Sequence, residues 1–398
     1  MTPFITLVLA EFLARFGYTM ARSPVLPRFA QDLGASPQLI GLIVAASTVT
    51  GVAIKLPAGA LSDLLGRKRV MLLGCLFFAG PPFLYPLVHS PGTLLALRFL
   101  HGFATAIFAP VASAFVADLS QRGRGEKLGW FAAAGDLGRT LGPLLGGLLL
   151  FYTASYPMTY LGVGVLGLLP LLMVLRLPDQ EPPRAARSSL GSRSRQFWNG
   201  IREVCSSRAV IIASTLEAAL YVGYGTFLGF FPPYAKGIGL NDAEIALVMG
   251  AQLATTMLAK PLSGRLSDRL GRKPMILAGL CLSAATLPAI PAATSLWFLF
   301  PVSALFGLGV AIVTPSTTAL VADLVKAGRM GSAMGVFGTI WDSGEAAGPI
   351  LAGFLIASLS YPPAFSLIAA AMAAMALVFL VAVKDPTPPV TAAAERAA

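Results

Sequence analysis

Residues 59–68 read Gly-Ala-Leu-Ser-Asp-Leu-Leu-Gly-Arg-Lys, and residues 264–273 read Gly-Arg-Leu-Ser-Asp-Arg-Leu-Gly-Arg-Lys. Both copies lie between long apolar segments, and Asp63 returns as Asp268, 205 positions later. Because further landmarks keep an offset of 205 or 206 residues, the repeat covers the whole chain and predicts two related halves. The matched pairs are Lys55 with Lys260, Gly102 with Gly307, Pro110 with Pro315, Asp118 with Asp323, Asp136 with Asp342, Pro143 with Pro349, and Glu11 with Glu217.

The composition is that of a membrane protein. Of the 398 residues 56% are hydrophobic and only 12% are charged, whereas soluble domains carry roughly 25% charged residues. Apolar runs of about 20 residues recur, each long enough to cross a hydrocarbon core of about 30 Å as a helix. We therefore predict an all-α polytopic membrane protein with twelve spans, near residues 3–24, 38–58, 69–88, 93–117, 127–151, 157–176, 209–231, 243–262, 274–293, 296–322, 333–357 and 362–383.

The positive charge follows the predicted topology. The formal net charge is +11, and clusters of Lys and Arg follow spans 2, 4, 6, 8 and 10, whereas the loops after spans 3, 5, 9 and 11 contain none. By the positive-inside rule both termini are cytoplasmic. Topology thus explains the basic composition, and we predict a multi-pass protein of the inner or plasma membrane that does not bind nucleic acid.

The chain divides at a segment rich in Pro, Arg and Ser. Residues 177–208 carry this composition and separate six predicted spans from six. We predict an N-terminal bundle at 1–176, a cytoplasmic linker at 177–208, a C-terminal bundle at 209–383 and a cytoplasmic tail at 384–398.

Two six-span halves, a basic linker and the repeated loop together resemble the major facilitator superfamily over essentially the whole chain. The second loop copy meets the family's pattern Gly-x-Leu-x-Asp-Arg-x-Gly-Arg-Lys in full, whereas the first has Leu64 where Arg is usual. The resemblance implies two pseudo-symmetric six-helix bundles around a central cavity that opens alternately to each side. Leu64 is expected to weaken the first copy by removing one cation.

The loop residues suit a gate. Gly59 and Gly66 allow close backbone approach and tight turns, and Asp63 can accept hydrogen bonds from Arg67. Asp118, at the end of span 4, is a second candidate partner for Arg67. The resemblance implies a latch between the halves in the outward-facing state; the alternative is that these charges only fix the topology. The predicted cytoplasmic gate comprises Gly59, Asp63, Gly66, Arg67, Lys68, Asp118, Gly264, Asp268, Gly271 and Arg272.

Spans 5 and 11 share a row of glycines followed by proline, which resembles the signature of exporters and antiporters in the superfamily. Small residues allow helix backbones to approach closely, and proline perturbs the helix. Close packing without a role in transport is the alternative. The predicted interface motif comprises Gly138, Gly142, Pro143, Gly146, Gly147, Gly348 and Pro349.

Eight of the charged residues within the predicted spans are candidate site residues. Each costs roughly 2.5–3.5 kcal/mol near the bilayer centre, so eight unpaired charges would cost on the order of 20 kcal/mol. They are therefore expected to pair or to face a wet cavity. Residues at i,i+3 and i,i+4 share a helix face and can pair. These residues are Glu11, Arg15, Arg98, Asp136, Arg139, Glu217, Asp342 and Glu345.

The charges of span 11 suggest a proton carrier. Asp342 and Glu345 share a helix face, so two negative charges compete unless one takes a proton. Arg139 occupies the place equivalent to Glu345 in the other half. We hypothesise that Arg139 faces the acidic pair across the domain interface and that this pair carries the proton. A static lattice of salt bridges is the alternative.

Span 4 contains Arg98-Phe-Leu-His101-Gly102, which resembles the motif Arg-x-x-Gln-Gly of proton-coupled family members. Arg98 is a cation that can stabilise a neighbouring carboxylate and assist proton release. His101 titrates near neutral pH and offers either a protonation site or an ordinary hydrogen bond.

The resemblance to twelve-span drug:proton antiporters implies proton-coupled efflux of small amphipathic molecules. A symporter or exporter of a defined metabolite such as a sugar, amino acid or siderophore is the alternative within the superfamily, and a membrane scaffold or intramembrane enzyme is the alternative from another class.

The sequence contains no cluster at the spacing of a zinc site, no protease dyad and no nucleotide-binding loop. We therefore expect no enzyme, no metal and no cofactor, and a monomer whose partners are substrate, protons and the lipid bilayer. The charge of the substrate stays open, because the spans contain both Glu11 and Arg15.

Overall fold

The computed structural model describes residues 2–119, 123–179, 207–325 and 330–383. Within these ranges the chain is helical and forms no strand. The described residues belong to two compact units, which are treated separately below. Most of the predicted linker and all of the predicted tail fall outside the described residues.

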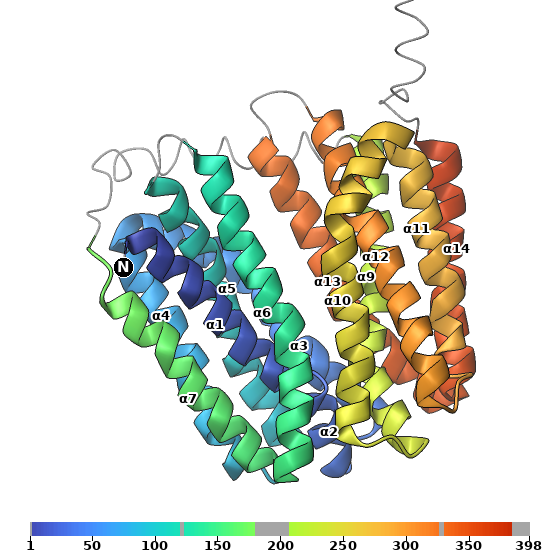
Figure 1. Cartoon of the computed structure of the whole chain (residues 1–398), viewed down its shortest axis with the longest axis horizontal. Coiled ribbons are helices and arrows are strands. Elements are labelled where there is room, and N and C mark those ends of the chain that lie inside the picture. Colours follow the sequence, from blue (N-terminus) through green and yellow to red (C-terminus); the bar gives the residue numbers. More distant parts are fainter. Residues whose placement is uncertain (1, 120–122, 180–206, 326–329, 384–398) are drawn as a thin grey trace, which may run out of the picture. The chain divides into compact units, whose positions relative to one another are not determined.

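The first unit, called unit 1, holds the described residues up to 179 together with Ala235–Gly250. The sequence-based division placed 235–250 in the C-terminal bundle, but these residues pack with unit 1, where Ser23 Oγ lies 3.7 Å from Met249 Sδ. Its helices run alongside one another in Figure 1. They are α1 (Pro3–Arg22), α2 (Val25–Asp32), α3 (Pro37–Leu65), α4 (Arg67–Ala79), the 3-10 helix η1 (Pro81–Leu87), α5 (Pro91–Asp118), α6 (Arg124–Thr153) and α7 (Tyr156–Leu175).

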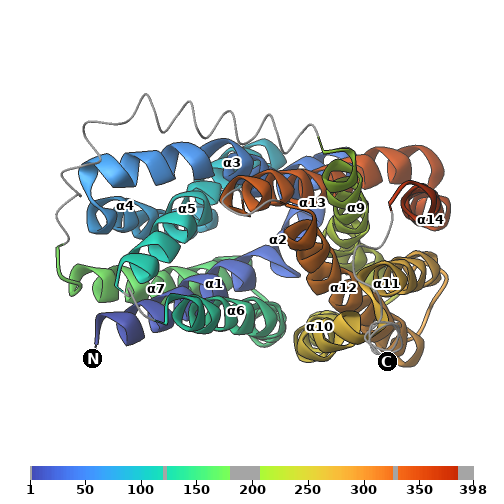
Figure 2. The same cartoon turned by 90° about the horizontal axis from the view of Figure 1, so that it is seen from above.

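The second unit, called unit 2, holds the other described residues from 207 to 234 and from Ala251 onward. Figure 2 shows its helices from above, with α11 beside α12. They are α9 (Arg208–Gly237), α10 (Asp242–Leu270), α11 (Arg272–Thr286), the 3-10 helix η3 (Leu287–Ala289), α12 (Leu296–Leu324), α13 (Met330–Leu359) and α14 (Tyr361–Ala382). The last residues of α9 and the first residues of α10, within Ala235–Gly250, belong to unit 1.

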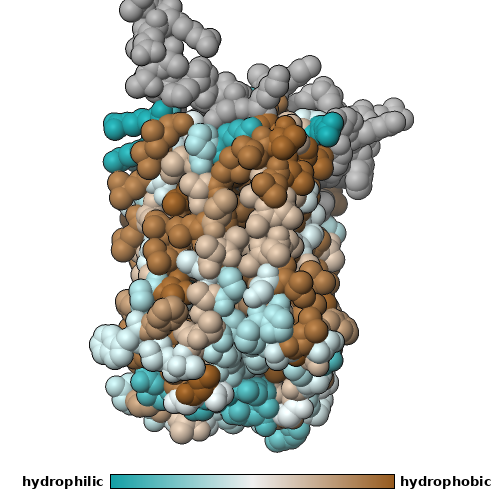
Figure 3. Space-filling view, turned by 90° about the vertical axis from the view of Figure 1, so that its right-hand side faces the viewer, coloured by the Kyte–Doolittle hydropathy of each residue, from teal (hydrophilic) through white to brown (hydrophobic). Residues whose placement is uncertain are grey.

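Every predicted span coincides with a helix, and nine helices of the described chain are long and apolar enough to cross a membrane. The remaining long helices are α6 and α13, which carry the charged pairs of spans 5 and 11, and α11, which has 15 residues. The surface agrees with a bilayer environment: Trp297 is 86% exposed and Tyr152 is 79% exposed. Figure 3 shows hydrophobic residues over the middle of one face and polar residues toward its two ends. Such a band is costly in water and favourable in lipid.

Serine and threonine caps begin several of these helices. The hydroxyl of Ser90 accepts the Thr93 N–H at 3.3 Å, and that of Ser155 accepts the Met158 N–H at 3.3 Å. A proline in the first turn follows each cap, where its missing N–H costs nothing. Local sequence therefore defines where these helices start.

The two loop copies turn on one glycine each. Gly66 has φ 94° and is the single residue between α3 and α4; Gly271 has φ 96° and stands between α10 and α11. Side chains rarely adopt such positive φ values, so the turn requires glycine. The repeated glycine of the motif is thus explained by backbone geometry.

Glycines also bring α1 onto α6 and α9 onto α13. A Cβ added at Gly138 would lie 2.5 Å from the Phe12 carbonyl oxygen on α1. Thr19 Oγ1 donates to the Gly138 carbonyl at 3.2 Å, and Thr226 Oγ1 donates equivalently to the Gly348 carbonyl at 3.2 Å. The predicted glycine motif therefore forms close helix packing inside each unit, and its role in transport stays a prediction.

We expect Gly138→Ala to destabilise the protein, because the new methyl group overlaps the α1 backbone and neither helix can move without disturbing its neighbours. Overpacking of this kind costs about 1–3 kcal/mol. Thermal unfolding in detergent measures it. The control is Gly129→Ala in the same helix, where a Cβ meets nothing within 4 Å; equal melting temperatures for the two variants would contradict the packing.

Candidate functional site

Two buried glutamates occupy equivalent places in the two units. In unit 1, Glu11 is 3% exposed, and Arg15 Nε lies 2.7 Å from its Oε1. The pair was predicted from its i,i+4 spacing and lies on α1, with Gly135 of α6 leaving room for the carboxylate. A guanidinium only donates hydrogen bonds, so Glu11 is the acceptor in this contact.

In unit 2, Glu217 has a different partner. It is 1% exposed, and its Oε2 contacts the hydroxyl of Thr317 on α12, which is fully buried. Lys260 on α10 is the charged residue that acts on it electrostatically. Glu217 was predicted as a site residue, whereas Thr317 was missed because an interior threonine carries no distinctive sequence signal.

The charges of spans 5 and 11 lie on α6 and α13. Arg139 Nη2 donates to Asp136 Oδ1 at 2.8 Å, as the i,i+3 spacing predicted, and both side chains are partly exposed. Asp342 and Glu345 are 7% and 8% exposed. Because Arg139 belongs to unit 1 and the acidic pair to unit 2, their encounter stays a prediction.

Arg98 is completely buried among neutral groups. Its Nη2 donates to Ser47 Oγ at 2.8 Å, its Nη1 lies 3.5 Å from the Tyr85 hydroxyl, and its Cζ lies 5.5 Å from the centre of the Tyr18 ring. His101 Nδ1 is 3.2 Å from the Tyr85 hydroxyl, which is the ordinary hydrogen bond considered above. Among the described residues no carboxylate pairs with Arg98, so this geometry does not place it beside a proton carrier.

Each loop copy forms an arginine-centred triad inside its own unit. Arg67 lies 2.6 Å from Asp63 and 3.2 Å from Asp118, the two partners predicted for it. Lys68, also placed in the gate, pairs instead with Asp179 at 3.6 Å. These contacts tie α3, α4 and α5 together.

The second triad repeats the first. Arg272 lies 2.5 Å from Asp268 and 3.2 Å from Asp323. Arg269, which stands where the first copy has Leu64, makes none of these contacts. Residue 64 therefore does not belong to the triad of the first copy, and the expected effect of Leu64 on a latch between the halves stays a prediction.

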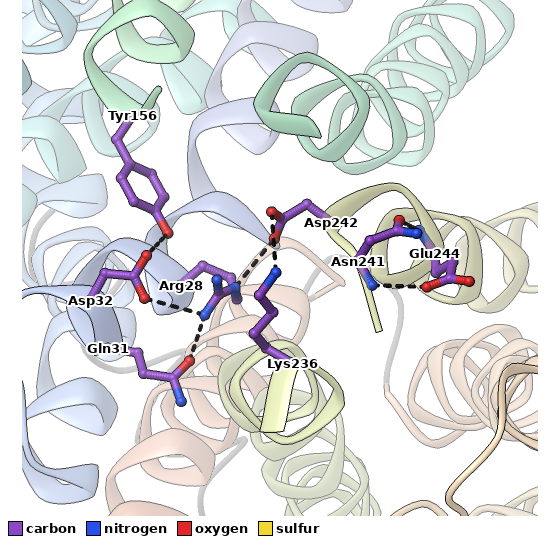
Figure 4. Close-up of polar contacts among 8 residues, drawn as sticks. All are labelled: Arg28, Gln31, Asp32, Tyr156, Lys236, Asn241, Asp242 and Glu244. Atoms are coloured by element: carbon purple, nitrogen blue, oxygen red, sulfur yellow. Dashed lines mark hydrogen bonds and ion pairs between the residues drawn. The ribbon is translucent and has the colours of Figure 1, made fainter. Parts of the chain in front are cut away.

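A third charged cluster, missed from the sequence, lies in unit 1, where α2 meets the start of α10 (Figure 4). Its centre is Arg28 of α2, only 4% exposed, whose Nε donates to Asp242 Oδ1 at 3.2 Å and whose Nη1 is 3.4 Å from Asp32 Oδ1. Tyr156 donates to Asp32 Oδ2 at 2.6 Å. We call Arg28, Gln31, Asp32, Tyr156, Lys236 and Asp242 the Arg28 cluster.

A capping box supports Asp242. Asn241 Oδ1 accepts the Glu244 N–H at 2.9 Å, and Glu244 Oε2 accepts the Asn241 N–H at 2.8 Å, so the first turn of α10 is rigidly formed. One feature of the sequence could have indicated the Arg28 cluster. The short segments after spans 1 and 7 carry residues of opposite charge, although the positive-inside rule expects few cations there.

Packed helices with exposed apolar side chains and internal charges are typical of a multi-pass membrane protein. The profile of the Major Facilitator Superfamily matches residues 7–241 and 214–398, and the chain belongs to that superfamily. An uncharacterised MFS-type transporter of Methanocaldococcus jannaschii is 25% identical over 362 residues, 89% of each chain. The quinolone resistance protein NorA of Staphylococcus aureus strain MRSA252 is 24% identical over 358 residues, 90% of this chain and 91% of NorA.

Two solved structures share the fold. The nucleoside transporter NupG superimposes with a TM-score of 0.82 at 14% identity, over 96% of this chain and 100% of its own. A bacterial homologue of the human lysosomal transporter Spinster superimposes with a TM-score of 0.77 at 15% identity, over 94% of each chain. At these identities the likeness concerns the fold alone.

We expect Arg28→Gln to loosen the first turn of α10, because it leaves two carboxylates without their shared cation. Breaking a buried ion pair costs about 3–5 kcal/mol, and since both acids are partly exposed we expect at least about tenfold faster amide exchange across residues 242–247. Hydrogen exchange with mass spectrometry measures it. The matched control is Lys236→Gln, because Lys236 lies 3.9 Å from Asp242 and is 41% exposed; unchanged exchange in Arg28→Gln would refute the cluster's role.

Proposed function

We propose that the protein is a secondary transporter that expels small amphipathic molecules in exchange for protons. In this proposal twelve spans cross the inner or plasma membrane, both termini are cytoplasmic, and the monomer works by alternating access. Membership of the superfamily supports transport, and the end-to-end similarity to NorA supports drug efflux. The proton coupling rests on one observation, the contrast between the two buried glutamates.

Glu11 and Glu217 stand at equivalent positions but meet different chemistry. Glu11 lies against the guanidinium of Arg15, which only donates hydrogen bonds, whereas Glu217 lies against a hydroxyl, which can donate to a carboxylate or accept from a carboxylic acid. A group that exchanges protons must be tolerated in both forms. Glu217 is therefore our first candidate for the proton carrier.

The exchange scheme needs competition between proton and substrate. If substrate binds only the ionised transporter, each half-cycle carries one of the two, and the proton gradient drives efflux. The acidic pair Asp342 and Glu345, with Arg139 opposite in the proposed cycle, is the second candidate for the carrier. Asp342 and Glu345 are buried carboxylates, as Glu217 is.

Charged clusters are proposed to control access at the two ends. The Arg67 and Arg272 triads stand at the predicted cytoplasmic end, and the Arg28 cluster stands at the opposite end of α3. Ion pairs that bind helices firmly yet reversibly suit a protein whose helices must regroup during transport. The Gly-Pro rows keep α1 on α6 and α9 on α13, so each pair is proposed to move as a rigid element.

Export of a defined metabolite is the alternative. NupG is a nucleoside transporter, and its likeness to this chain makes a nucleoside a necessary probe alongside drugs. The Gly-Pro rows, which resemble those of exporters, favour efflux over uptake.

Proteoliposomes with an acidic interior provide the test. We expect the wild-type protein to accumulate a quinolone or a permanently charged aromatic cation in the interior, in exchange for protons. Glu217→Gln should abolish this accumulation, because the neutral amide mimics the protonated acid, which does not bind substrate in the exchange scheme. Accumulation of a nucleoside alone would instead support the metabolite alternative, and gradient-driven accumulation by Glu217→Gln would refute its role.

The two candidate carriers are separated by Asp342→Asn and Glu345→Gln. If Glu217 carries the proton, both variants keep transport that depends on the pH gradient, although its rate falls. Initial rates measured at several external pH values distinguish the cases. Loss of the pH dependence in these variants, with retention in Glu217→Gln, would assign the proton to the acidic pair.

A further inference from the structure

We infer that Thr317 is a positioning residue whose hydroxyl reverses its hydrogen bond each time Glu217 gains or loses a proton. The role of this hydrogen bond in transport rests on the proposed function. The hydrogen bond itself does not, because Thr317 and Glu217 both belong to unit 2. Nothing in the loop or Gly-Pro motifs involves this residue.

Thr317 Oγ1 has two acceptors within reach but only one proton. It contacts Glu217 Oε2 on α9 and lies 2.8 Å from the carbonyl oxygen of Val313, one turn earlier on α12. The Thr314 carbonyl oxygen is more distant at 3.3 Å. A hydroxyl donates one hydrogen bond and accepts up to two, so the two short contacts cannot both be donated at once.

The protonation state of Glu217 decides which contact Thr317 donates. When Glu217 is ionised, the hydroxyl donates to Oε2. When Glu217 is protonated, its own O–H donates to Thr317 Oγ1, and the threonine proton turns to the Val313 carbonyl. Only rotation about the Cβ–O bond is required, and neither state leaves a buried donor without an acceptor.

Unit 1 shows what happens without the hydroxyl. Ala112 stands at the position equivalent to Thr317, and Tyr221 stands at the position equivalent to Arg15. The Arg15 guanidinium beside Glu11 only donates hydrogen bonds, so it offers no acceptor for the O–H of a protonated carboxyl group. The duplicated bundle has kept the acid in both units and changed what surrounds it.

The other charged groups around Glu217 come from two helices. Lys260 on α10 acts on it electrostatically. The helix α13, whose Gly344 packs against Ala218, carries Asp342 and Glu345. Lys260 only donates hydrogen bonds, so among the described contacts of Glu217 the Thr317 hydroxyl is the group that can both donate to the carboxyl group and accept from it.

Infrared difference spectroscopy of the full chain in liposomes tests the inference without transport. The carboxylic-acid band that disappears in Glu217→Gln reports protonated Glu217, and its amplitude is followed against pH. We expect Thr317→Val to move the half-amplitude to higher pH by about one unit, because the bond lost to the carboxylate is stronger than the bond lost to the neutral acid. Thr317→Ser restores the hydroxyl and should titrate like the wild type.

The matched control is Thr318→Val, the same substitution one residue on, since the Thr318 hydroxyl donates to the Thr314 carbonyl at 2.8 Å. Thr317→Val that titrates like wild type and Thr318→Val would overturn the inference, as would Thr317→Ser that shifts like Thr317→Val. Absence of a Glu217-dependent band in the wild type would overturn it too. A band that shifts as expected in a protein whose transport ignores the pH gradient would uphold the hydrogen-bond switch and refute the proposed proton coupling.

Discussion

Hydrocarbon offers no hydrogen bonds, so every charge inside the helices of this chain must be stabilised by the protein itself. The chain meets this constraint in three ways. Arg15 pairs with Glu11 on the same helix, Arg98 lies among hydroxyl groups and aromatic rings, and Glu217 lies against a hydroxyl from a neighbouring helix. Glycines that bring helices together are part of the same solution, because short side chains allow such distant partners to meet.

The duplication explains which features the two units share. Glycine at the turn between two long helices, an arginine triad beside that turn, and a threonine that donates to a glycine carbonyl all occur twice. Both copies share these requirements of the fold, and the triads are in addition proposed to control access. The differences lie at buried polar positions, where folding accepts several solutions and function selects among them.

Local patterns made much of this predictable. The loop glycines, the Glu11–Arg15 pair and the Asp136–Arg139 pair follow from turn geometry and helical spacing, which act within a few residues. Arg28 and Asp242 are 214 residues apart, and Glu217 and Thr317 are 100 apart, so only the packed chain brings them together. Arg98 shows the other limit: its motif indicated a carboxylate neighbour, but in the described chain its partners are neutral.

The inclusion of Ala235–Gly250 in unit 1 has a consequence for biogenesis. Arg28 of the first unit cannot pair with Asp242 until the chain has been synthesised past that residue, well beyond the predicted linker. Domains generally fold in order as they leave the ribosome, yet this one must wait for a segment of the following half. During that interval Arg28 and Asp32 have only each other and local neighbours, so insertion of the second half also completes the first.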